Sequence, residues 1–556
     1  MAVRSLDRRF AGRVIVERLG RGVGSALQTF RRQGSTPRRV CAGMGAIGEV
    51  ARALRHRGCT HVFGVPGGGP NLELIGELER NGIEFVLAHG ESGAAMMASA
   101  HGLTTGTLSA VVVTRGPGVS SVVNGAAQAT LDRAPLVVIT DTVPMSQRER
   151  VAHQRFDQRA VLRPVTLRTA RIGDDVTAEE MVDLLSCVDG GRSGAVHLDL
   201  DAGASTDIDP PRSVDQPMTA AAADVVRVRL EGSEHPVVIT GIHAPDNLSG
   251  PLESFGAPVL TTYQGAGALA EGHPLLAGMF TNAEPERQLL VDADMVVLIG
   301  FDDVEPMPGP WPGTAEVVAI DPVPTSHRFA PVSWAYVGEP ADVLPERRPS
   351  HSGAREHLRS VRARLSDAAR PLGPIELVRS AAEVWPDDGM VTVDAGAHFL
   401  AVLPFWPVTR RRQLLISNGL ATMGYALPAA IGASLASPDR SVLSLTGDGG
   451  LQMMLAELET LQRLQLPVCV TVFNDSELTL IKLKQRDGQG DQRAIRYGAS
   501  NFAAIAEGFG MLATVVDNAE NLHEAFRSAL DARAPYLIDV RIDPTEYRHI
   551  MAVSRG

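Results

Sequence analysis

The chain contains no long apolar run and little cysteine. No uninterrupted apolar stretch of the sequence approaches the roughly 20 residues that a membrane-spanning helix needs. The cysteines are widely spaced, with no CxxC pair, and stand at Cys41, Cys59, Cys187 and Cys469. These absences argue against a membrane-spanning helix and against a disulfide framework, and they predict a soluble cytoplasmic protein with reduced thiols.

An excess of positive charge is also missing, because the formal net charge is −12. A general nucleic-acid binder needs a basic surface that displaces phosphate counterions, so we expect no nucleic-acid partner. Neither GxSxG nor GxxxxGK occurs, which excludes the serine-nucleophile elbow and the Walker phosphate loop. A GxGxxG string at 43–48 has no strand before it and therefore does not qualify as a dinucleotide-binding fingerprint.

Acidic residues are scarce in the first 42 positions, where only Asp7 and Glu17 interrupt a segment rich in arginine. Such a composition is typical of organellar transit peptides. The alternative that we favour is a dispensable, disordered basic extension over 1–42. Either way, we leave this segment out of the prediction of the fold.

The remaining sequence alternates short apolar runs with amphipathic stretches. Runs that are apolar on both faces, separated by predicted helices, indicate βαβ units and a parallel sheet covered on both sides. A polar, proline-rich stretch at 202–220 and a second polar break after Pro345 divide this pattern. We predict three doubly wound α/β domains, over 43–201, 220–345 and 372–545.

The clearest polar signal lies where two consecutive predicted strands end. The run SVLSLTG stops at Asp448, and PVCVTVF stops at Asn474, 26 residues after Asp448. That spacing fits one βαβ crossover, which brings both turns to the same carboxyl edge of the sheet. We therefore expect Asp448 and Asn474 to face one crevice.

The residue types at this edge suit a metal-bound diphosphate. Carboxylate and amide oxygens are ligands that Mg²⁺ or Ca²⁺ prefers. Gly447, Gly449 and Gly450 would let the backbone approach a ligand closely, and a helix over LQMMLAELETLQRL, after Gly450, would offer free N–H groups to phosphate. The alternative is a doubly wound domain whose glycine turn has no function.

The segment GDGGLQMMLAELETLQRLQLPVCVTVFND resembles the thiamine-diphosphate motif of the acetolactate synthase superfamily. The resemblance extends over nearly all the chain after residue 45. It implies an N-terminal pyrimidine-binding domain, a central Rossmann-like domain and a C-terminal diphosphate-binding domain. It also implies thiamine diphosphate and Mg²⁺ as cofactors, with the side chains of Asp448 and Asn474 and the carbonyl of Ser476 as metal ligands.

Other segments carry further residues of the family's pattern. VFGVPGGG resembles the first glycine turn, RGPG the second, and VTVDAGAH the loop that touches the diphosphate. LAHGESGAAMMASAHGLTTG is similar to the segment with the catalytic glutamate, and SNGLATMGYALPAAIGA to the one that shapes the cofactor. The positions that match are Gly67, Gly68, Glu91, Gly116, Gln154, Gly396, His398 and Met423.

In this family the glutamate hydrogen-bonds the aminopyrimidine ring, which then takes the proton from C2 of the thiazolium. The resemblance assigns that role to Glu91, whose burial would raise its pKa and let it share a proton. Met423 would hold the cofactor in the bent shape that this transfer needs. The alternative for Glu91 is a carboxylate that merely stabilises the start of a helix.

Several positions depart from the pattern of authentic acetolactate synthases. Gly90, Ala397 and Asp475 replace the usual His, Gln and second Asn, and of the usual Phe-Gln-Glu only Gln154 is kept. Lys484 stands where the family has the Trp that shapes the second-substrate pocket. Lys484 indicates an anionic substrate or, equally, a solvated charge on a helix.

These observations support three hypotheses for the function. The first is a carboligase that decarboxylates a 2-oxo acid and joins the remainder to an acceptor. The second is a simple 2-oxo acid decarboxylase or lyase of the benzoylformate decarboxylase type, and the third is a scaffold of this fold without catalysis. The resemblance further implies a homodimer or homotetramer with the active site at the subunit interface. The sequence does not decide whether the central domain binds FAD, because the GFDD segment at 300–303 lacks the arginine that follows it in the family.

Overall fold

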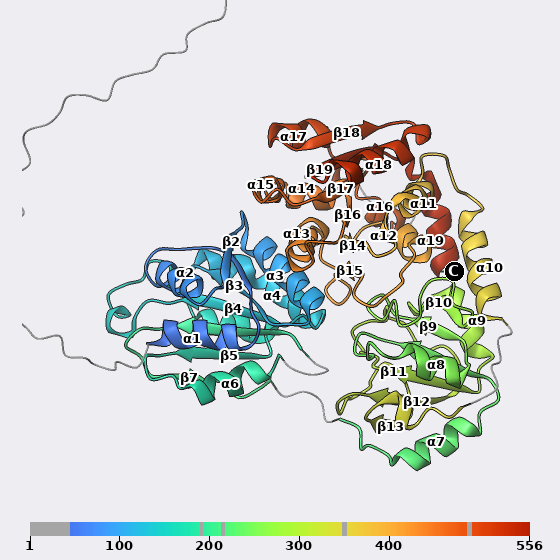
Figure 1. The fold of residues 1–556 in the computed structure, drawn as a ribbon, viewed down its shortest axis with the longest axis horizontal. Helices are drawn as coiled ribbons and strands as arrows, with labels where there is room; N and C mark the ends of the chain where they lie inside the picture. The colour runs from blue at the N-terminus through green and yellow to red at the C-terminus, as the bar shows by residue number, and fades with distance from the viewer. Residues whose placement is uncertain (1–44, 189–192, 213–216, 347–352, 486–491, 556) are drawn as a thin grey trace, which may run out of the picture. The chain divides into compact units, whose positions relative to one another are not determined.

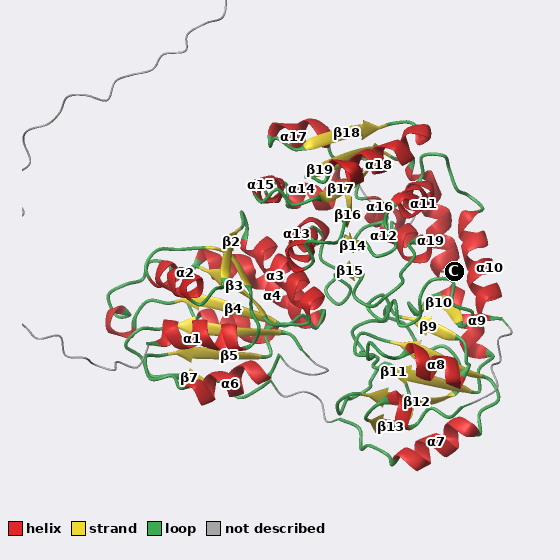
Figure 2. Ribbon diagram, viewed as in Figure 1, coloured by secondary structure: helices red, strands yellow, loops and turns green. Residues whose placement is uncertain are grey.

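The computed structural model describes residues 45–188, 193–212, 217–346, 353–485 and 492–555. The extension predicted over 1–42 lies outside these residues. The described chain forms three sheets, each with helices packed along it (Figures 1 and 2). Within the described residues, no helix is both long enough and apolar enough to cross a membrane.

The N-terminal sheet has the order β2-β1-β3-β4-β6-β5-β7. Its strands are β1 (His61–Val65), β2 (Glu84–Leu87), β3 (Ser109–Val113), β4 (Leu136–Asp141), β5 (Arg168–Ile172), β6 (Ala195–Leu200) and β7 (Asp207–Ile208). Its helices are α1 (Ala46–His56), α2 (Pro70–Arg80), α3 (Glu91–Thr105), α4 (Pro117–Leu131), α5 (Gln158–Leu162) and α6 (Ala178–Ser186). All pairings are parallel except that of β7, which runs antiparallel to β5.

The central sheet has the order β10-β9-β8-β11-β12-β13 and is parallel throughout. Its strands are β8 (Pro236–Thr240), β9 (Val259–Thr261), β10 (Leu276–Met279), β11 (Met295–Ile299), β12 (Glu316–Asp321) and β13 (Val332–Val337). The accompanying helices are α7 (Ala223–Glu231), α8 (Ser249–Phe255), α9 (Glu284–Val291) and α10 (Ala354–Ser366).

The C-terminal sheet has the order β15-β14-β16-β17-β19-β18, again parallel. Its strands are β14 (Met390–Val393), β15 (Leu414–Ile416), β16 (Val442–Gly447), β17 (Val468–Asn474), β18 (Leu512–Val516) and β19 (Tyr536–Arg541). Its helices are α11 (Pro374–Val384), α12 (Phe399–Phe405), α13 (Ala426–Ala436), α14 (Asp448–Met453), α15 (Glu457–Arg463), α16 (Thr479–Leu483), α17 (Phe502–Gly508), α18 (Leu522–Ala532) and α19 (Tyr547–Arg555).

The strands with continuous apolar runs are the buried ones, as the pattern predicts. Every residue of β3, β4, β6 and β17 is buried. A strand covered on both faces cannot alternate polar and apolar residues, which is why these segments are recognisable in the sequence. The prediction of three parallel α/β domains is confirmed.

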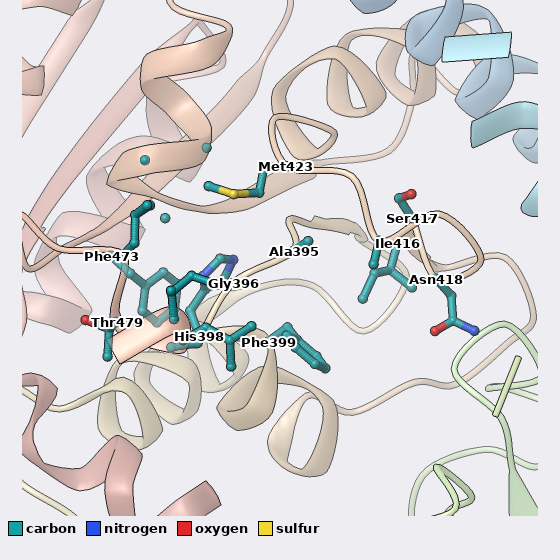
Figure 3. Close-up of a pocket in the computed structure, with 18 of the residues that line it drawn as sticks. Ala395, Gly396, His398, Phe399, Ile416, Ser417, Asn418, Met423, Phe473 and Thr479 are labelled. Carbon is teal, nitrogen blue, oxygen red and sulfur yellow. The ribbon is translucent and has the colours of Figure 1, made fainter. Parts of the chain in front are cut away.

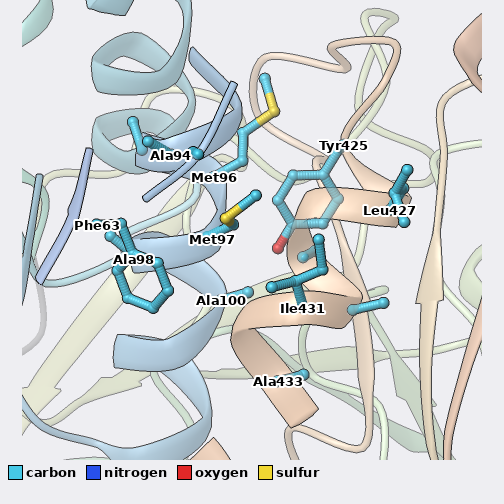
Figure 4. Packing of buried hydrophobic residues seen from close by; sticks show 14 of the residues in the cluster. Phe63, Ala94, Met96, Met97, Ala98, Ala100, Tyr425, Leu427, Ile431 and Ala433 are labelled. Atoms are coloured by element: carbon cyan, nitrogen blue, oxygen red, sulfur yellow. The ribbon is translucent and has the colours of Figure 1, made fainter. Parts of the chain in front are cut away.

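The N-terminal and C-terminal domains meet through α3 and α13. Figure 4 shows Met96 and Met97 of α3 beside Tyr425 and Ile431, which all belong to one buried cluster. At Gly432 the two helices touch backbone to backbone, since a Cβ there would lie 2.0 Å from the carbonyl oxygen of Met97. This close crossing fixes α3, and with it Glu91, against the C-terminal domain of the same chain.

The helix predicted after Gly450 is wrong in its bounds. Helix α14 already begins at Asp448 and ends before Met454, and α15 starts separately at Glu457. Met454 leaves the helical conformation with φ −126°, and its side chain packs beside Gly424, where a Cβ would lie 2.9 Å from its Cγ. Tertiary packing therefore interrupts a segment whose amphipathic pattern is continuous.

Candidate functional site

A cavity of about 790 Å³ opens at the carboxyl edge of the C-terminal sheet. Loops that follow β14, β15, β16 and β17 form most of its wall, and residues 304–308 of the central domain complete it. Figure 3 shows the side chains of Met423, His398 and Phe473 around this space. Ligands of doubly wound domains bind at this edge, where the strand order reverses.

Two of the predicted metal-binding residues contact the third through its N–H and its hydroxyl, while its carbonyl, the predicted ligand atom, accepts from the Tyr497 N–H at 3.4 Å. The carboxylate of Asp448 accepts a hydrogen bond from the Ser476 backbone N–H at 2.6 Å. The Ser476 hydroxyl lies 3.5 Å from the amide oxygen of Asn474. Ser476 has a φ of 59°, a left-handed conformation that non-glycine residues seldom adopt, and this turn places it between the other two.

The orientation of Asn474 is fixed by residues that the sequence motif does not contain. Its amide nitrogen donates to a carboxylate oxygen of Asp539 at 2.8 Å and to the carbonyl of Ser500 at 3.2 Å. Since both acceptors face the nitrogen, the amide oxygen is turned toward Ser476; neither residue lines the cavity, although their neighbours Phe473 and Asp475 do. Asp539 lies in β19, and no local pattern marks it as part of the site.

Tyr497 is a second residue that sequence reasoning missed. Its hydroxyl donates to Asp448 at 2.7 Å, and the same carboxylate accepts from the Gly449 N–H, also at 2.7 Å. Burial raises the pKa of Asp448, and these donors, with Ser476, partly offset the effect. A carboxylate that accepts three donors is held rigidly and keeps lone pairs for a cation.

Asp475 occupies the position of the family's second asparagine and also faces the cavity. It accepts hydrogen bonds from the Thr479 hydroxyl at 2.6 Å and from the Glu477 N–H at 3.2 Å. Burial first, and then the neighbouring charges of Asp448 and Glu477, raise the pKa of Asp475 to about 6. The substitution therefore leaves the turn intact and adds a second acid to it.

The glycines predicted to lie against a ligand are sites of close approach. A Cβ at Gly450 would lie 2.2 Å from the Asp394 carboxylate, and one at Gly449 would lie 2.9 Å from the Tyr497 hydroxyl. No side chain fits at either place without a shift. Gly449 also borders Met423, whose methyl group is 3.4 Å from the same Cβ position.

The ring of His398 packs against the other two glycines predicted to lie near the cofactor, Gly396 and Gly447. A Cβ at Gly396 would lie 2.6 Å from its ring, and one at Gly447 would lie 3.3 Å away. The ring stacks on Phe473 with centroids 5.1 Å apart. Burial lowers the pKa of His398 to about 3, so the ring is neutral, and its buried Nε2 has no hydrogen-bond partner among the described residues.

A second group of predicted residues gathers in the N-terminal domain. Glu91 is the first residue of α3, and its carboxylate lies beside Gly118, where a Cβ would be 3.5 Å from it. Gly116 has a φ of 71° and touches Gln154. A Cβ placed on Gly116 would lie 2.9 Å from the Cβ of Gln154. Glu91, the second glycine turn and Gln154 are thus neighbours, as the resemblance implies.

The first glycine turn is only partly constrained. A Cβ at Gly67 would lie 2.2 Å from the Thr114 hydroxyl, whereas nothing lies within 4 Å of one at Gly68. The Gly67 N–H donates to the side chain of Asn71 at 2.9 Å. Gly67 is therefore required by packing, and Gly68 faces open space.

Glu457 joins the two groups within one chain. It is buried, and its carboxylate accepts hydrogen bonds from the backbone N–H groups of His89 at 3.1 Å and Gly90 at 3.0 Å. These are the residues immediately before Glu91. An acid that the sequence shows only as one helix charge among several therefore positions the start of α3.

Glu91 nevertheless does not line the cavity of its own chain, which is built from described residues alone. Its side chain is half-buried rather than buried, unlike the prediction. A single chain thus brings together the diphosphate-side residues in one place and the Glu91-side residues in another.

Comparison with known proteins agrees with this division. Three family models match the chain: the N-terminal TPP binding domain of thiamine pyrophosphate enzymes over residues 48–161, their central domain over 223–346, and their C-terminal TPP binding domain over 394–540. The chain belongs to the thiamine pyrophosphate enzymes. Its three sheets correspond to these three domains, and the enzyme is of the acetolactate synthase superfamily.

Several curated relatives resemble this thiamine pyrophosphate enzyme along most of their length. An acetolactate synthase of Bacillus subtilis is 29% identical over 89% of this chain and 92% of its own. A catabolic acetolactate synthase of Raoultella terrigena is 29% identical over 89% of this chain and 94% of its own. The large subunit of acetolactate synthase isozyme 1 of Escherichia coli gives the same identity and the same coverage.

The residues of this thiamine pyrophosphate enzyme fit the diphosphate end of the cofactor. The buried Nε2 of His398 has no partner among the described residues and so leaves a polar contact open to a ligand, and Gly449 and Gly450 pack so closely against Tyr497 and Asp394 that the turn beside the cavity carries no side chain there. The carboxylate of Asp448, the amide oxygen of Asn474 and a backbone oxygen form a donor set suited to Mg²⁺.

A second cavity, of about 1020 Å³, lies at the edge of the central sheet. Asp302 of the GFDD segment is already engaged there, bonding Arg133 at 2.8 and 3.0 Å and His243 at 2.9 Å. The lining is rich in arginine, through Arg57, Arg133, Arg411 and Arg412. An arginine-lined cavity at the carboxyl edge of a parallel sheet suits a phosphorylated ligand, so FAD stays a prediction for this domain.

Proposed function

We propose that this enzyme decarboxylates a 2-oxo acid and joins the remaining acyl unit to a second 2-oxo acid, as acetolactate synthases do. In the net reaction the bond between the donor's carbonyl carbon and its carboxylate breaks, and CO₂ leaves. A new bond joins that carbonyl carbon to the carbonyl carbon of the acceptor, whose oxygen takes up one proton. Thiamine diphosphate, when bound, supplies the nucleophilic carbon and the electron sink for this chemistry.

We assign cofactor binding to the 790 Å³ cavity of the C-terminal domain. Asp448, Asn474 and the Ser476 carbonyl would hold Mg²⁺, and His398 would contact the diphosphate. The observation that carries the proposal is the convergence of Asp448 and Asn474 on Ser476, together with the rigid hold on each by Tyr497 and Asp539. Rigid positioning of ligands by outer hydrogen bonds is what a metal site requires.

Glu91, Met423 and Gln154 take the catalytic roles. Glu91 holds and shares a proton at the aminopyrimidine, which is the proton movement that the family's chemistry needs. Met423 stands beside Gly449 at the cavity, where its side chain would support the bound cofactor. Gln154 faces the same turn as Glu91 and contributes to substrate contacts on that side.

A homodimer with two shared sites would reconcile the two separate groups of residues. The Glu91 side of one subunit would face the Asp448 side of its partner. The half-buried state of Glu91 and its absence from the cavity of its own chain support this arrangement. A homotetramer built from two such dimers fits equally well.

Product analysis with pyruvate as the only substrate tests the proposal. We expect acetolactate and CO₂ when the enzyme is supplied with thiamine diphosphate and Mg²⁺. Acetaldehyde in place of acetolactate would favour a simple decarboxylase of the benzoylformate decarboxylase type. A panel of other 2-oxo acids should accompany pyruvate, because the departures at Asp475 and Lys484 affect the cavity itself.

Ligand titration tests the cofactor assignment directly. Saturating thiamine diphosphate with Mg²⁺ should raise the melting temperature, because a ligand that binds only the folded state stabilises it. EDTA should abolish most of that rise if Mg²⁺ bridges the diphosphate to Asp448. No stabilisation at saturating cofactor would favour a scaffold, and the absorbance of ligands released from purified protein tests FAD.

A further inference from the structure

Lysine is almost absent from this chain. Of its 52 lysine and arginine residues, only Lys482 and Lys484 are lysine, and they stand two positions apart. Lysine provides a compact ammonium on a flexible stem, whereas arginine provides a broad planar fork that forms paired hydrogen bonds. Since arginine serves at every other lysine or arginine position, this turn is the one place where the sequence carries lysine.

The two lysines differ in what they face. Lys482, in α16, forms an ion pair with Glu477. Lys484 follows the end of that helix and lines the 790 Å³ cavity. Among the described residues, none forms a hydrogen bond or an ion pair with the Lys484 ammonium. Lys482 therefore serves the local structure, and Lys484 is available to a ligand in the cavity.

Lys484 is also the single lysine or arginine among the described residues that line this cavity. The other ionisable residues of the lining are His398, Tyr263, Tyr547 and the acids Glu305, Asp448, Asp475 and Glu477. Burial keeps His398 neutral, since its pKa is lowered to about 3. An organic anion that enters the cavity thus meets the side chain of one basic residue, Lys484.

Two carboxylates enter the reaction, and only one benefits from such a cation. The donor's carboxylate leaves as CO₂, so an ion pair with it would stabilise the reactant more than the transition state and slow its loss. The acceptor's carboxylate keeps its charge throughout. Resting on the function proposed above, we propose that Lys484 binds the carboxylate of the acceptor 2-oxo acid and thereby directs the enzyme toward carboligation.

The neighbours of Lys484 restrict the rest of the acceptor. Leu478, Leu480 and Ile481 line the cavity from the same segment. Next to a single cation, an apolar wall accommodates a short aliphatic substituent but offers no partner for a second carboxylate. The acceptor is therefore a short aliphatic 2-oxo monocarboxylate.

Three variants distinguish the effects of charge, of side-chain shape and of local structure on the product ratio. Lys484→Met removes the charge with little change in length, and Lys484→Arg keeps the charge. Lys482→Met is the matched control. It removes the same charge two residues away from Lys484, and the Lys482 side chain does not line the cavity. Each variant is compared with the wild-type holoenzyme for CO₂ release and for the ratio of acetolactate to acetaldehyde from pyruvate.

We expect Lys484→Met to lower the ratio of acetolactate to CO₂ by about tenfold, the value of one charge-assisted hydrogen bond, while CO₂ release changes by no more than about threefold. Acetaldehyde should take the place of acetolactate. Lys484→Arg should restore most of the ratio, and Lys482→Met should leave the ratio unchanged. A merely structural role for Lys484 would lower both products together.

A binding measurement tests the same assignment without turnover. Oxamate, an unreactive analogue of pyruvate, is titrated into each holoenzyme by calorimetry, and its Kd should rise about tenfold in Lys484→Met alone. Lys484→Met with an unchanged product ratio and unchanged oxamate affinity overturns the assignment, as does a wild-type enzyme that does not bind oxamate. Wild-type enzyme that releases no CO₂ from any 2-oxo acid contradicts the proposed function instead, and the oxamate series still decides the role of Lys484.

Discussion

At the scale of single residues, the acids around the cavity differ in their protonation because they differ in burial. Glu305 is fully enclosed, and burial raises its pKa to about 8, an effect that hydrogen bonds from Thr262 and the Ile242 N–H only partly offset. The charge of Asp302 adds to the rise. Glu305 is therefore a neutral acid at neutral pH, and its backbone carbonyl accepts a hydrogen bond from Asn418 of the C-terminal domain at 3.0 Å.

This state of Glu305 makes stability depend on pH. An unfolded glutamate titrates near 4.5, whereas the folded one keeps its proton to about 8. Between these values the unfolded chain releases a proton that the folded chain retains, so stability falls as the pH rises through this window. Glu305→Gln removes that dependence. The difference between its free energy of unfolding and that of the wild type should therefore grow, in favour of the variant, by about 1 kcal/mol per pH unit across the window.

Urea unfolding of both proteins near pH 5, 6.5 and 8 measures the effect. Glutamine can keep the contact with Thr262 by donating its amide N–H to the hydroxyl, so the substitution should not disturb the packing. A free-energy difference between the two proteins that stays constant across the three pH values would mean that Glu305 is ionised in the folded chain.

The sequence predicts best those residues whose role depends on a neighbour in the chain. Asp448, Asn474 and Ser476 are recognisable because strand, turn and helix follow one another along the sequence. Tyr497 and Asp539 reach the same site from elements further along the chain, Glu457 acts on the Glu91 side, and single residues of common types leave no local pattern. Their roles follow only from the folded structure.

At the scale of elements, the contact between α3 and α13 explains why glycine stands at certain helix positions. Both Gly432 in α13 and Gly76 in α2 lie in helices, where alanine is intrinsically preferred by about 1 kcal/mol. A Cβ at Gly432 would clash with the Met97 carbonyl at 2.0 Å, whereas nothing lies within 4 Å of one at Gly76. The two positions therefore respond to the same substitution in opposite ways.

We expect Gly432→Ala to lower the free energy of unfolding by about 2 kcal/mol, because the two helix backbones must separate. Gly76→Ala should raise it by about 0.5 kcal/mol, because alanine narrows the unfolded ensemble without any clash. Chemical denaturation of both variants beside wild type measures the two effects. Equal effects of the same sign would show that α3 and α13 do not touch at Gly432.

The elements also show where sequence patterns cease to be informative. The buried strands β3, β4, β6 and β17 coincide with apolar runs of the sequence. The break between α14 and α15 has no signal of its own, since Met454 is a good helix former and departs from the helix through its packing against Gly424. Likewise, the short β7 pairs antiparallel to β5 although the rest of the pattern predicts parallel strands.

At the scale of the whole molecule, we propose that one active site needs two chains. Each chain holds an Asp448 side that forms a cavity and a Glu91 side that does not reach it. Either Asp448→Ala or Glu91→Gln alone should therefore reduce CO₂ release by more than about 100-fold, since both sites of a homodimer then lose an essential group.

Coexpression of the two inactive chains tests the claim most directly. In a mixed dimer, Glu91 of the Asp448→Ala chain meets Asp448 of the Glu91→Gln chain, which restores one intact site and leaves the other doubly altered. With random pairing, activity should return to about a quarter of the wild-type value, because half of the dimers are mixed and half of their sites are intact. Mixed dimers purified through two different affinity tags and found as inactive as either parent would contradict the shared site.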